Sequence, residues 1–176
     1  MKAEEPFRLE TERLAIRALD SDADAEFVND LLNSPKFLQY IGDRVVRSVA
    51  DARDFIETRY RQSYRDHGFG LYAVERLGDG AKIGLCGFVR RDTLPDVDLG
   101  FAFLPEYERQ GYGFESAAAV MKYGRETFGF ETVLAITSLN NDASGSLLEK
   151  LGFSFDRIID SGSDQLKLYN LNFPQK

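Results

Sequence analysis

The stretch that most restricts the fold is a pair of glycines between a strand pattern and a helix pattern. Gln110-Gly111-Tyr112-Gly113 follows apolar alternation over residues 97–103 and precedes helical spacing over residues 114–128. Two glycines separated by one residue allow a tight turn, and the first turn of the following helix has N–H groups without intrahelical partners. The stretch therefore predicts a loop that binds a phosphate or pyrophosphate. A tight strand-to-helix turn that binds nothing is the alternative.

The segments on either side of this loop predict a βαβ unit. Thr132 to Ser138 is a short apolar run bounded by polar residues, which is typical of a strand buried on both faces. Apolar and small residues recur at helical spacing before it: Ala117, Val120, Met121, Gly124 and Phe128. Because a helix would connect the two strands, we expect them to lie side by side and parallel.

The remaining patterns complete a single α/β (α+β) domain over residues 1–176. Alternation over residues 7–19 predicts an opening strand, and capping patterns predict helices that begin at Ser21 and Ser48. Asp79-Gly80 predicts a hairpin, a further helix runs from Asn141 to Leu151, and two strands close the chain. We expect a mixed central sheet of about seven strands with helices on both faces.

Charge and composition exclude several classes of function. The net charge of −7 argues against nonspecific nucleic-acid binding, and it favours cationic partners. No apolar run reaches the roughly 20 residues of a membrane span, and the N-terminus lacks the pattern of a signal peptide. We therefore expect a cytoplasmic protein that binds neither nucleic acid nor membrane.

The chain has one cysteine and one histidine. An internal disulfide, a cysteine-clustered metal site and a zinc site built on several histidines are therefore excluded, and we predict no metal site. Cys86 lies in the middle of a predicted strand, where a small core residue is favoured over a nucleophile because no motif supplies a base. His67 is predicted to be an exposed loop histidine.

The strand before the glycine loop has one bulky face and one small face. Val97, Leu99, Phe101 and Phe103 alternate with Asp98, Gly100 and Ala102. The small face leaves room for a ligand beside the backbone and places one carboxylate there. Ser144 lies on the inward face at the start of a helix, where it is either a functional hydroxyl or a first-turn serine that satisfies the helix.

The element order and three motifs resemble those of the Gcn5-related N-acetyltransferases (GNAT) over essentially the whole chain. Residues 97–113, VDLGFAFLPEYERQGYG, are similar to the strand and acetyl-CoA pyrophosphate loop of the branch named for acetylation of ribosomal-protein N-termini (RimJ/RimL-like). Glu115-Ser116-Ala117 resembles the helix opening of that branch. Residues 141–144 and 148–153 resemble its Asn-x-x-Ser and Leu-Glu-Lys-x-Gly-Phe signatures.

The resemblance implies acetyl-CoA as a cosubstrate, lying between two splayed parallel strands at residues 97–103 and 132–138. The implied cofactor-binding residues belong to the first of these strands, the glycine loop and the helix that follows the second strand: Phe101, Ala102, Phe103, Leu104, Arg109, Gln110, Gly111, Tyr112, Gly113, Phe114, Asn141, Ser144 and Lys150. Glu108 departs from the family pattern, which has Gln or Arg there. A carboxylate near a pyrophosphate is unfavourable unless it points away or pairs with Arg109.

The implied reaction is direct transfer of the acetyl group to a primary amine. An ammonium must lose a proton before it can attack, and Asp98 is the candidate base, acting directly or through water. Its alternatives are an electrostatic anchor for the amine and a structural residue paired with Arg90 or Arg91. Ser144, with Asn141, would meet the sulfur of the leaving thiolate. Backbone N–H groups of the cofactor strand could hold the oxyanion.

The sequence does not identify the acceptor. It is a protein N-terminus or a small-molecule amine such as a polyamine or an aminoglycoside, bound by a monomer or a homodimer. Its pocket should involve the first two helices, residues 91–96 and the last hairpin. Two rival functions are a CoA-binding sensor without transferase activity, which the departure at Glu108 favours, and an acyltransferase that uses a longer acyl chain.

Overall fold

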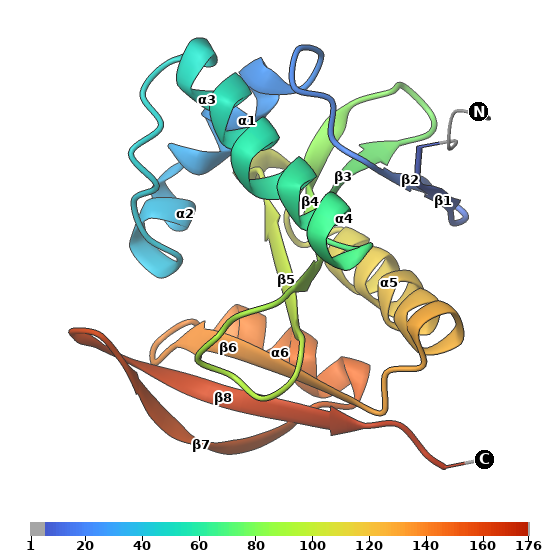
Figure 1. The fold of residues 1–176 in the computed structure, drawn as a ribbon, viewed down its shortest axis with the longest axis vertical. Helices are drawn as coiled ribbons and strands as arrows, with labels where there is room; N and C mark the ends of the chain where they lie inside the picture. Colours follow the sequence, from blue (N-terminus) through green and yellow to red (C-terminus); the bar gives the residue numbers. More distant parts are fainter. Residues whose placement is uncertain (1–5, 176) are drawn as a thin grey trace.

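A computed structural model describes residues 6–175 and shows one mixed sheet with helices on both faces (Figure 1). The eight strands follow the order β1-β2-β3-β4-β5-β6-β8-β7. Their bounds are Arg8–Glu10 (β1), Leu14–Arg17 (β2), Leu71–Arg76 (β3), Lys82–Val89 (β4), Asp98–Phe103 (β5), Thr132–Ser138 (β6), Ser154–Ser161 (β7) and Asp164–Asn172 (β8). All neighbours are antiparallel except β5 and β6, which are parallel as the βαβ pattern predicted.

The eighth strand arises at the N-terminal end, where the sequence predicted one strand over residues 7–19. The structure has a hairpin instead, in which β1 and β2 pair around a turn closed by the Thr11 N–H and the Leu14 carbonyl at 2.8 Å. The Thr11 hydroxyl also accepts from the Leu14 N–H at 3.1 Å. Local side-chain bonding of this kind favours a turn over a continuous strand.

The helices form two groups around the sheet. Their bounds are Ala25–Leu32 (α1), Pro35–Tyr40 (α2), Val49–Phe55 (α3), Ile56–Arg61 (η1, a π-helix), Gln62–His67 (α4), Pro105–Tyr107 (η2, a 3₁₀ turn), Tyr112–Phe128 (α5) and Asp142–Leu151 (α6). One buried cluster joins α5 and α6 to the sheet, and a second joins α1, α2, α3 and η1 to it. No helix within residues 6–175 is long and apolar enough to span a bilayer.

The first helix does not begin where the capping pattern placed it. Ser21 donates its hydroxyl to Glu57 at 2.7 Å, and the helix begins at Ala25. Asp24 stands at the cap position, but its buried carboxylate accepts hydrogen bonds from Arg17 at 2.8 and 2.9 Å. This ion pair connects α1 to β2, so a tertiary contact rather than a local cap fixes the start of the helix.

The second predicted helix start is confirmed. Ser48 accepts a hydrogen bond from the Asp51 N–H at 3.0 Å, as a capping residue does. Cys86 is completely buried in the core, in agreement with its predicted role, and burial raises the pKa of its thiol to about 12. His67 is exposed, although it ends α4 rather than lying in a loop, and its ring stacks on Phe69.

Candidate functional site

The site is built around the point where β5 and β6 separate. The two strands are in register only at Asp98 and Leu134, where the Leu134 N–H also donates to the Val97 carbonyl at 2.9 Å. Beyond that point they diverge, and a cleft of about 500 Å³ opens between them. Splayed strands leave backbone N–H and C=O groups available to a ligand that lies between them. Figure 1 shows this separation at the centre of the molecule.

The glycine loop lies at the N-terminus of α5, as predicted. Gly111 adopts a left-handed conformation with φ of 82° and is exposed. Gly113 has a different role, because a Cβ atom there would come within 3.0 Å of Leu147 on α6. The Tyr112 side chain is buried, so Tyr112 contributes its backbone N–H rather than its side chain to the exposed surface of the loop. The N–H groups of the first turn of α5 therefore form a surface suited to an anion.

Arg13 supports this loop from the β1–β2 hairpin. Its guanidinium donates to the Gln110 carbonyl at 3.0 Å and to Glu115 at 2.7 Å, and it lies 4.4 Å from the centre of the Tyr112 ring. Glu115 also accepts from the Thr11 hydroxyl at 2.6 Å. The sequence analysis gave Arg13 no role in the site. The contacts span about 100 residues, so no local pattern could reveal them.

Glu108 does not pair with Arg109. Its carboxylate forms an ion pair with Lys36 of α2, which directs the negative charge away from the glycine loop. Arg109 is exposed and adopts a φ of 61°, which is uncommon for a residue with a side chain. The departure at Glu108 therefore has a structural partner, a lysine whose positive charge offsets that of the carboxylate.

Asp98 is buried at the base of the cleft and pairs with Arg91. The guanidinium donates to its two carboxylate oxygens at 3.1 and 3.3 Å, while only 1% of the Asp98 side chain is exposed. Burial raises the pKa of Asp98 to about 6, although the charge and hydrogen bond of Arg91 act in the opposite direction. The ion pair with Arg91, which the sequence offered as a structural alternative to a catalytic role for Asp98, is thus present. A carboxylate with this pKa is also better matched to proton transfer than an ordinary aspartate.

The two faces of β5 divide the cleft as the alternation predicted. Leu99 belongs to the core beneath α5 and α6, and Phe101 and Phe103 pack against that core. Ala102 packs on the opposite side, among residues of α1 to α3. By strand alternation Asp98 lies on the same face as Ala102. The carboxylate and the glycine loop are therefore on opposite faces of the sheet, and the gap between β5 and β6 connects them.

Ser144 and Asn141 meet at the mouth of the gap, at the N-terminus of α6. The Asn141 side chain caps the helix by accepting from the Ser144 N–H at 3.3 Å. Both residues line the cleft. Ser144 is partly exposed at the cleft, so its hydroxyl can be reached by a ligand.

The opposite wall of the cleft comes partly from segments that the sequence predicted for the acceptor pocket. One further segment of this wall was not predicted. The lining includes Tyr60 of η1, Arg91, and Asp164 at the start of β8. Phe37 and Tyr40 come from α2, a short helix absent from the prediction. The charged lining residues are two arginines and two aspartates: Arg44, Arg91, Asp98 and Asp164. The overall negative charge of the chain is therefore not concentrated in the cleft.

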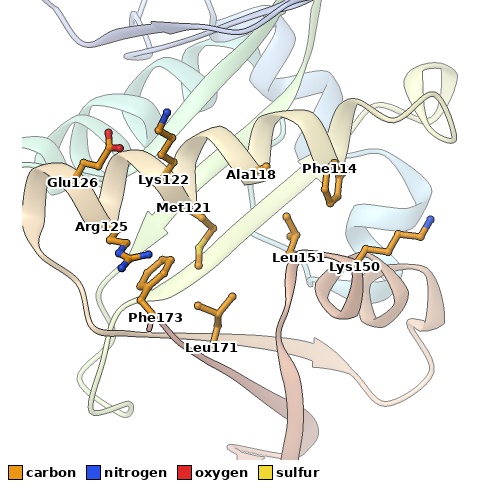
Figure 2. A pocket seen from close by; sticks show the side chains of 10 residues that line it. All are labelled: Phe114, Ala118, Met121, Lys122, Arg125, Glu126, Lys150, Leu151, Leu171 and Phe173. Carbon is orange, nitrogen blue, oxygen red and sulfur yellow. The ribbon is translucent and has the colours of Figure 1, made fainter. Parts of the chain in front are cut away.

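Four of the predicted cofactor residues line this cleft: Phe101, Ala102, Asn141 and Ser144. The others, including the whole glycine loop, lie outside it. Phe114 and Lys150 line a second groove, of about 650 Å³, between α5, α6 and the end of β8 (Figure 2). In Figure 2 the Phe114 ring and the Met121 side chain point into this groove. Leu104, directly after β5, packs against the cluster beneath the N-terminal helices. No group of three or more metal-ligating side chains occurs within residues 6–175.

Comparisons with known proteins agree with this architecture. Residues 13–154 match the family model described as acetyltransferase (GNAT) domain. The chain is 28% identical over 152 residues, 86% of this chain and 85% of the relative, to a protein of Bacillus subtilis (strain 168) described as the uncharacterized N-acetyltransferase YoaA.

Two solved structures illustrate the shared fold. An acetyltransferase from Agrobacterium tumefaciens str. C58 superimposes with a TM-score of 0.82 and 23% identity, over 95% of each chain. RimL, described as a ribosomal L7/L12 alpha-N-protein acetyltransferase in complex with coenzyme A, superimposes with a TM-score of 0.77 and 14% identity, over 94% of this chain and 98% of that one.

Proposed function

Because this chain belongs to the GNAT acetyltransferase family, we propose that it transfers the acetyl group of acetyl-CoA directly to a primary amine. The observation that supports this most is the gap between β5 and β6, which joins the glycine loop on one face to the buried Asp98 carboxylate on the other. In this arrangement the pyrophosphate binds the N–H groups around Gly111, and the pantetheine arm runs toward Ser144. Phe114 and Lys150 lie beside the nucleotide end.

Each step of the transfer has a group of this chain near it. Asp98, deprotonated above a pH of about 6, accepts a proton from the ammonium, through water where the two do not touch. The amine nitrogen then bonds to the thioester carbon, and backbone N–H groups of β5 hold the oxygen that becomes negative. As the carbon–sulfur bond breaks, the Ser144 hydroxyl donates a proton to the thiolate and takes one back from the nitrogen, directly or through water, as the amide forms.

The acceptor enters from the face of α1 to α4, where Asp98 lies. Since the charges that line the cleft balance, a polycation is not specifically favoured there. An uncharged or zwitterionic chain with a free amine, such as a peptide N-terminus, suits this wall better. The described activity of RimL on a protein α-amino group is consistent with that choice. Small-molecule amines remain the second acceptor class.

The proposed function is tested by measuring thiol release from acetyl-CoA with two panels of acceptors. One panel contains short peptides with free N-termini, and the other contains polyamines, aminoglycosides and amino acids. We expect thiol release that depends on the acceptor, with the acetyl group found on its amine by mass spectrometry. Coenzyme A binding without transfer to any member of either panel would favour the sensor that the sequence left as an alternative.

The pairing of Arg91 with Asp98 predicts a shift in the pH dependence of this reaction. Arg91→Gln removes the positive charge that holds the Asp98 pKa down to about 6, so the pKa rises. The acidic limb of the profile of kcat/KM against pH should therefore move to higher pH, by about one pH unit. The rate lost at pH 7 should largely return near pH 9.

Arg90→Gln is the matched control, because Arg90 is the exposed neighbour of the paired residue. Its acidic limb should coincide with that of the wild type. An acidic limb that stays in place in Arg91→Gln would show that Asp98 does not determine it.

A further inference from the structure

Thr137 lies on the cofactor side of β6. It shares a strand face with Val133 and Ala135, which belong to the core beneath α5 and α6. Its side chain lines the cleft together with Asn141 and Ser144 at the start of α6. Thr137 is therefore on the same face as the glycine loop, close to the place where the strands separate.

The Thr137 hydroxyl is buried without a partner. Only 7% of the residue is exposed, and its Oγ1 atom has no hydrogen-bond partner among residues 6–175. It is the one side-chain nitrogen or oxygen in that part of the chain with this property. Buried polar groups are nearly always hydrogen-bonded, and an unpaired one destabilises the folded chain. A hydroxyl in this state at the wall of a cleft suggests that a ligand supplies the missing partner.

The position restricts what that ligand can be. A molecule that begins at the glycine loop and reaches Ser144 passes along the face of β6 that bears Thr137. The other charged residues that line the cleft are Arg44, between α2 and α3, and Asp164, at the start of β8, so a neutral ligand segment suits this spot. The pantetheine arm of coenzyme A is neutral and has two amides, and either can exchange a hydrogen bond with a hydroxyl.

We propose that the Thr137 hydroxyl binds the pantetheine arm near its sulfur end and positions the thioester in the gap between β5 and β6. Thr137 is then a positioning residue for the acyl donor. This inference depends on the proposed function, because it takes coenzyme A as the ligand. In the ligand complex the Thr137 hydroxyl would gain the hydrogen-bond partner that it lacks among residues 6–175.

The test uses Thr137→Val, which keeps the shape of the side chain and removes the hydroxyl. Without ligand, we expect the melting temperature to rise by about 2–4 °C, because an unpaired buried hydroxyl is lost. The Kd for coenzyme A should rise about 5-fold, because a hydrogen bond is lost from the complex. The Kd for adenosine 3′,5′-bisphosphate, which lacks the arm, should stay the same. Calorimetric titration and thermal melts measure all three quantities.

Two variants serve as controls. Thr137→Ser keeps the hydroxyl, so it should bind coenzyme A within about 2-fold of the wild type. Thr132→Val lies on the same strand, but its hydroxyl already donates to Asn172 at 2.7 Å. It should lose a little stability and bind coenzyme A as the wild type does.

The outcomes separate this inference from the proposed function. The inference is wrong if Thr137→Val has a lower melting temperature, fails to fold, or binds coenzyme A with the Kd of the wild type. In each case a water molecule or a contact within the protein would satisfy the hydroxyl. Equal weakening of coenzyme A and the bisphosphate would also contradict it, because the effect would not involve the arm. If the wild type binds neither ligand, the proposed function fails as well.

Discussion

Gly111→Val is expected to weaken coenzyme A binding on the order of 10³-fold while the chain still folds. Gly111 has a φ of 82°, a conformation that a β-branched residue rarely adopts. A Cβ atom there would also come within 3.2 Å of the Arg13 guanidinium that supports the loop. The side chain would therefore displace the loop and block the approach of a pyrophosphate. A loss of two hydrogen bonds from backbone N–H groups to phosphate accounts for a change of this size.

Gly129→Val provides the matched control for backbone strain. Gly129 ends the same helix and has a φ of 68°, and a Cβ atom there would meet nothing within 4 Å. Both variants should lose stability through backbone strain, Gly111→Val more because its side chain also meets Arg13, but Gly129→Val should bind coenzyme A like the wild type. Calorimetric titration of both variants, with circular dichroism as the check on folding, decides the question. Unchanged affinity in folded Gly111→Val would remove the glycine loop from the cofactor site.

Asp98→Asn is expected to lower kcat on the order of 10²-fold or more. The substitution keeps the size of the side chain but removes the group that accepts the proton. The acidic limb of the pH profile, near pH 6 in the wild type, should disappear from the residual activity. A higher KM for the amine with kcat intact would instead identify Asp98 as an anchor for the substrate.

The same variant should be more stable than the wild type at pH 7. The pKa of Asp98 in the folded chain, about 6, lies above the ordinary value of about 3.9, so the folded chain binds this proton more tightly than the unfolded chain. The contribution of Asp98 to stability therefore falls as the pH rises from about 4 to about 6, and the penalty is complete above that. Asp98→Asn removes the penalty, which we expect to add on the order of 2 kcal/mol at pH 7.

At pH 4 this gain in stability should be absent, because the wild-type carboxyl is then mostly protonated in the folded chain and partly in the unfolded chain. Urea unfolding at the two pH values measures the difference. The Arg91 side chain, which is 37% exposed, can reach solvent when its partner loses its charge. A variant that is less stable at pH 7 would show that the ion pair is needed for the structure, and the structural alternative for Asp98 would then hold.

Strand alternation and glycine placement were sufficient to predict the backbone that surrounds the candidate site. A period of two is a local property, so the sequence could assign Asp98, Gly100 and Ala102 to one face of β5. The same holds for the turn before α5, where Gly111 has the positive φ that favours glycine. The parallel pairing of β5 with β6 also followed from one short crossover.

Long-range contacts could not be predicted in this way. Arg13 reaches Glu115 across 102 residues, and Lys36 reaches Glu108 across 72. Each side chain lies in an ordinary polar position of its own segment, and only the folded chain brings the pairs together. The start of α1 was predicted wrongly for a related reason, since the charge of Asp24 is used in an ion pair with Arg17.

The most direct test of acetyl transfer in the gap between β5 and β6 is a crystal structure of the chain with coenzyme A. We expect the pyrophosphate on the N–H groups at Gly111 to Gly113. We also expect the pantetheine arm in the gap between the two strands, and the sulfur beside Ser144. Coenzyme A bound elsewhere, or an empty gap at ligand concentrations that saturate binding in solution, would contradict the central claim that this gap is the site of acetyl transfer.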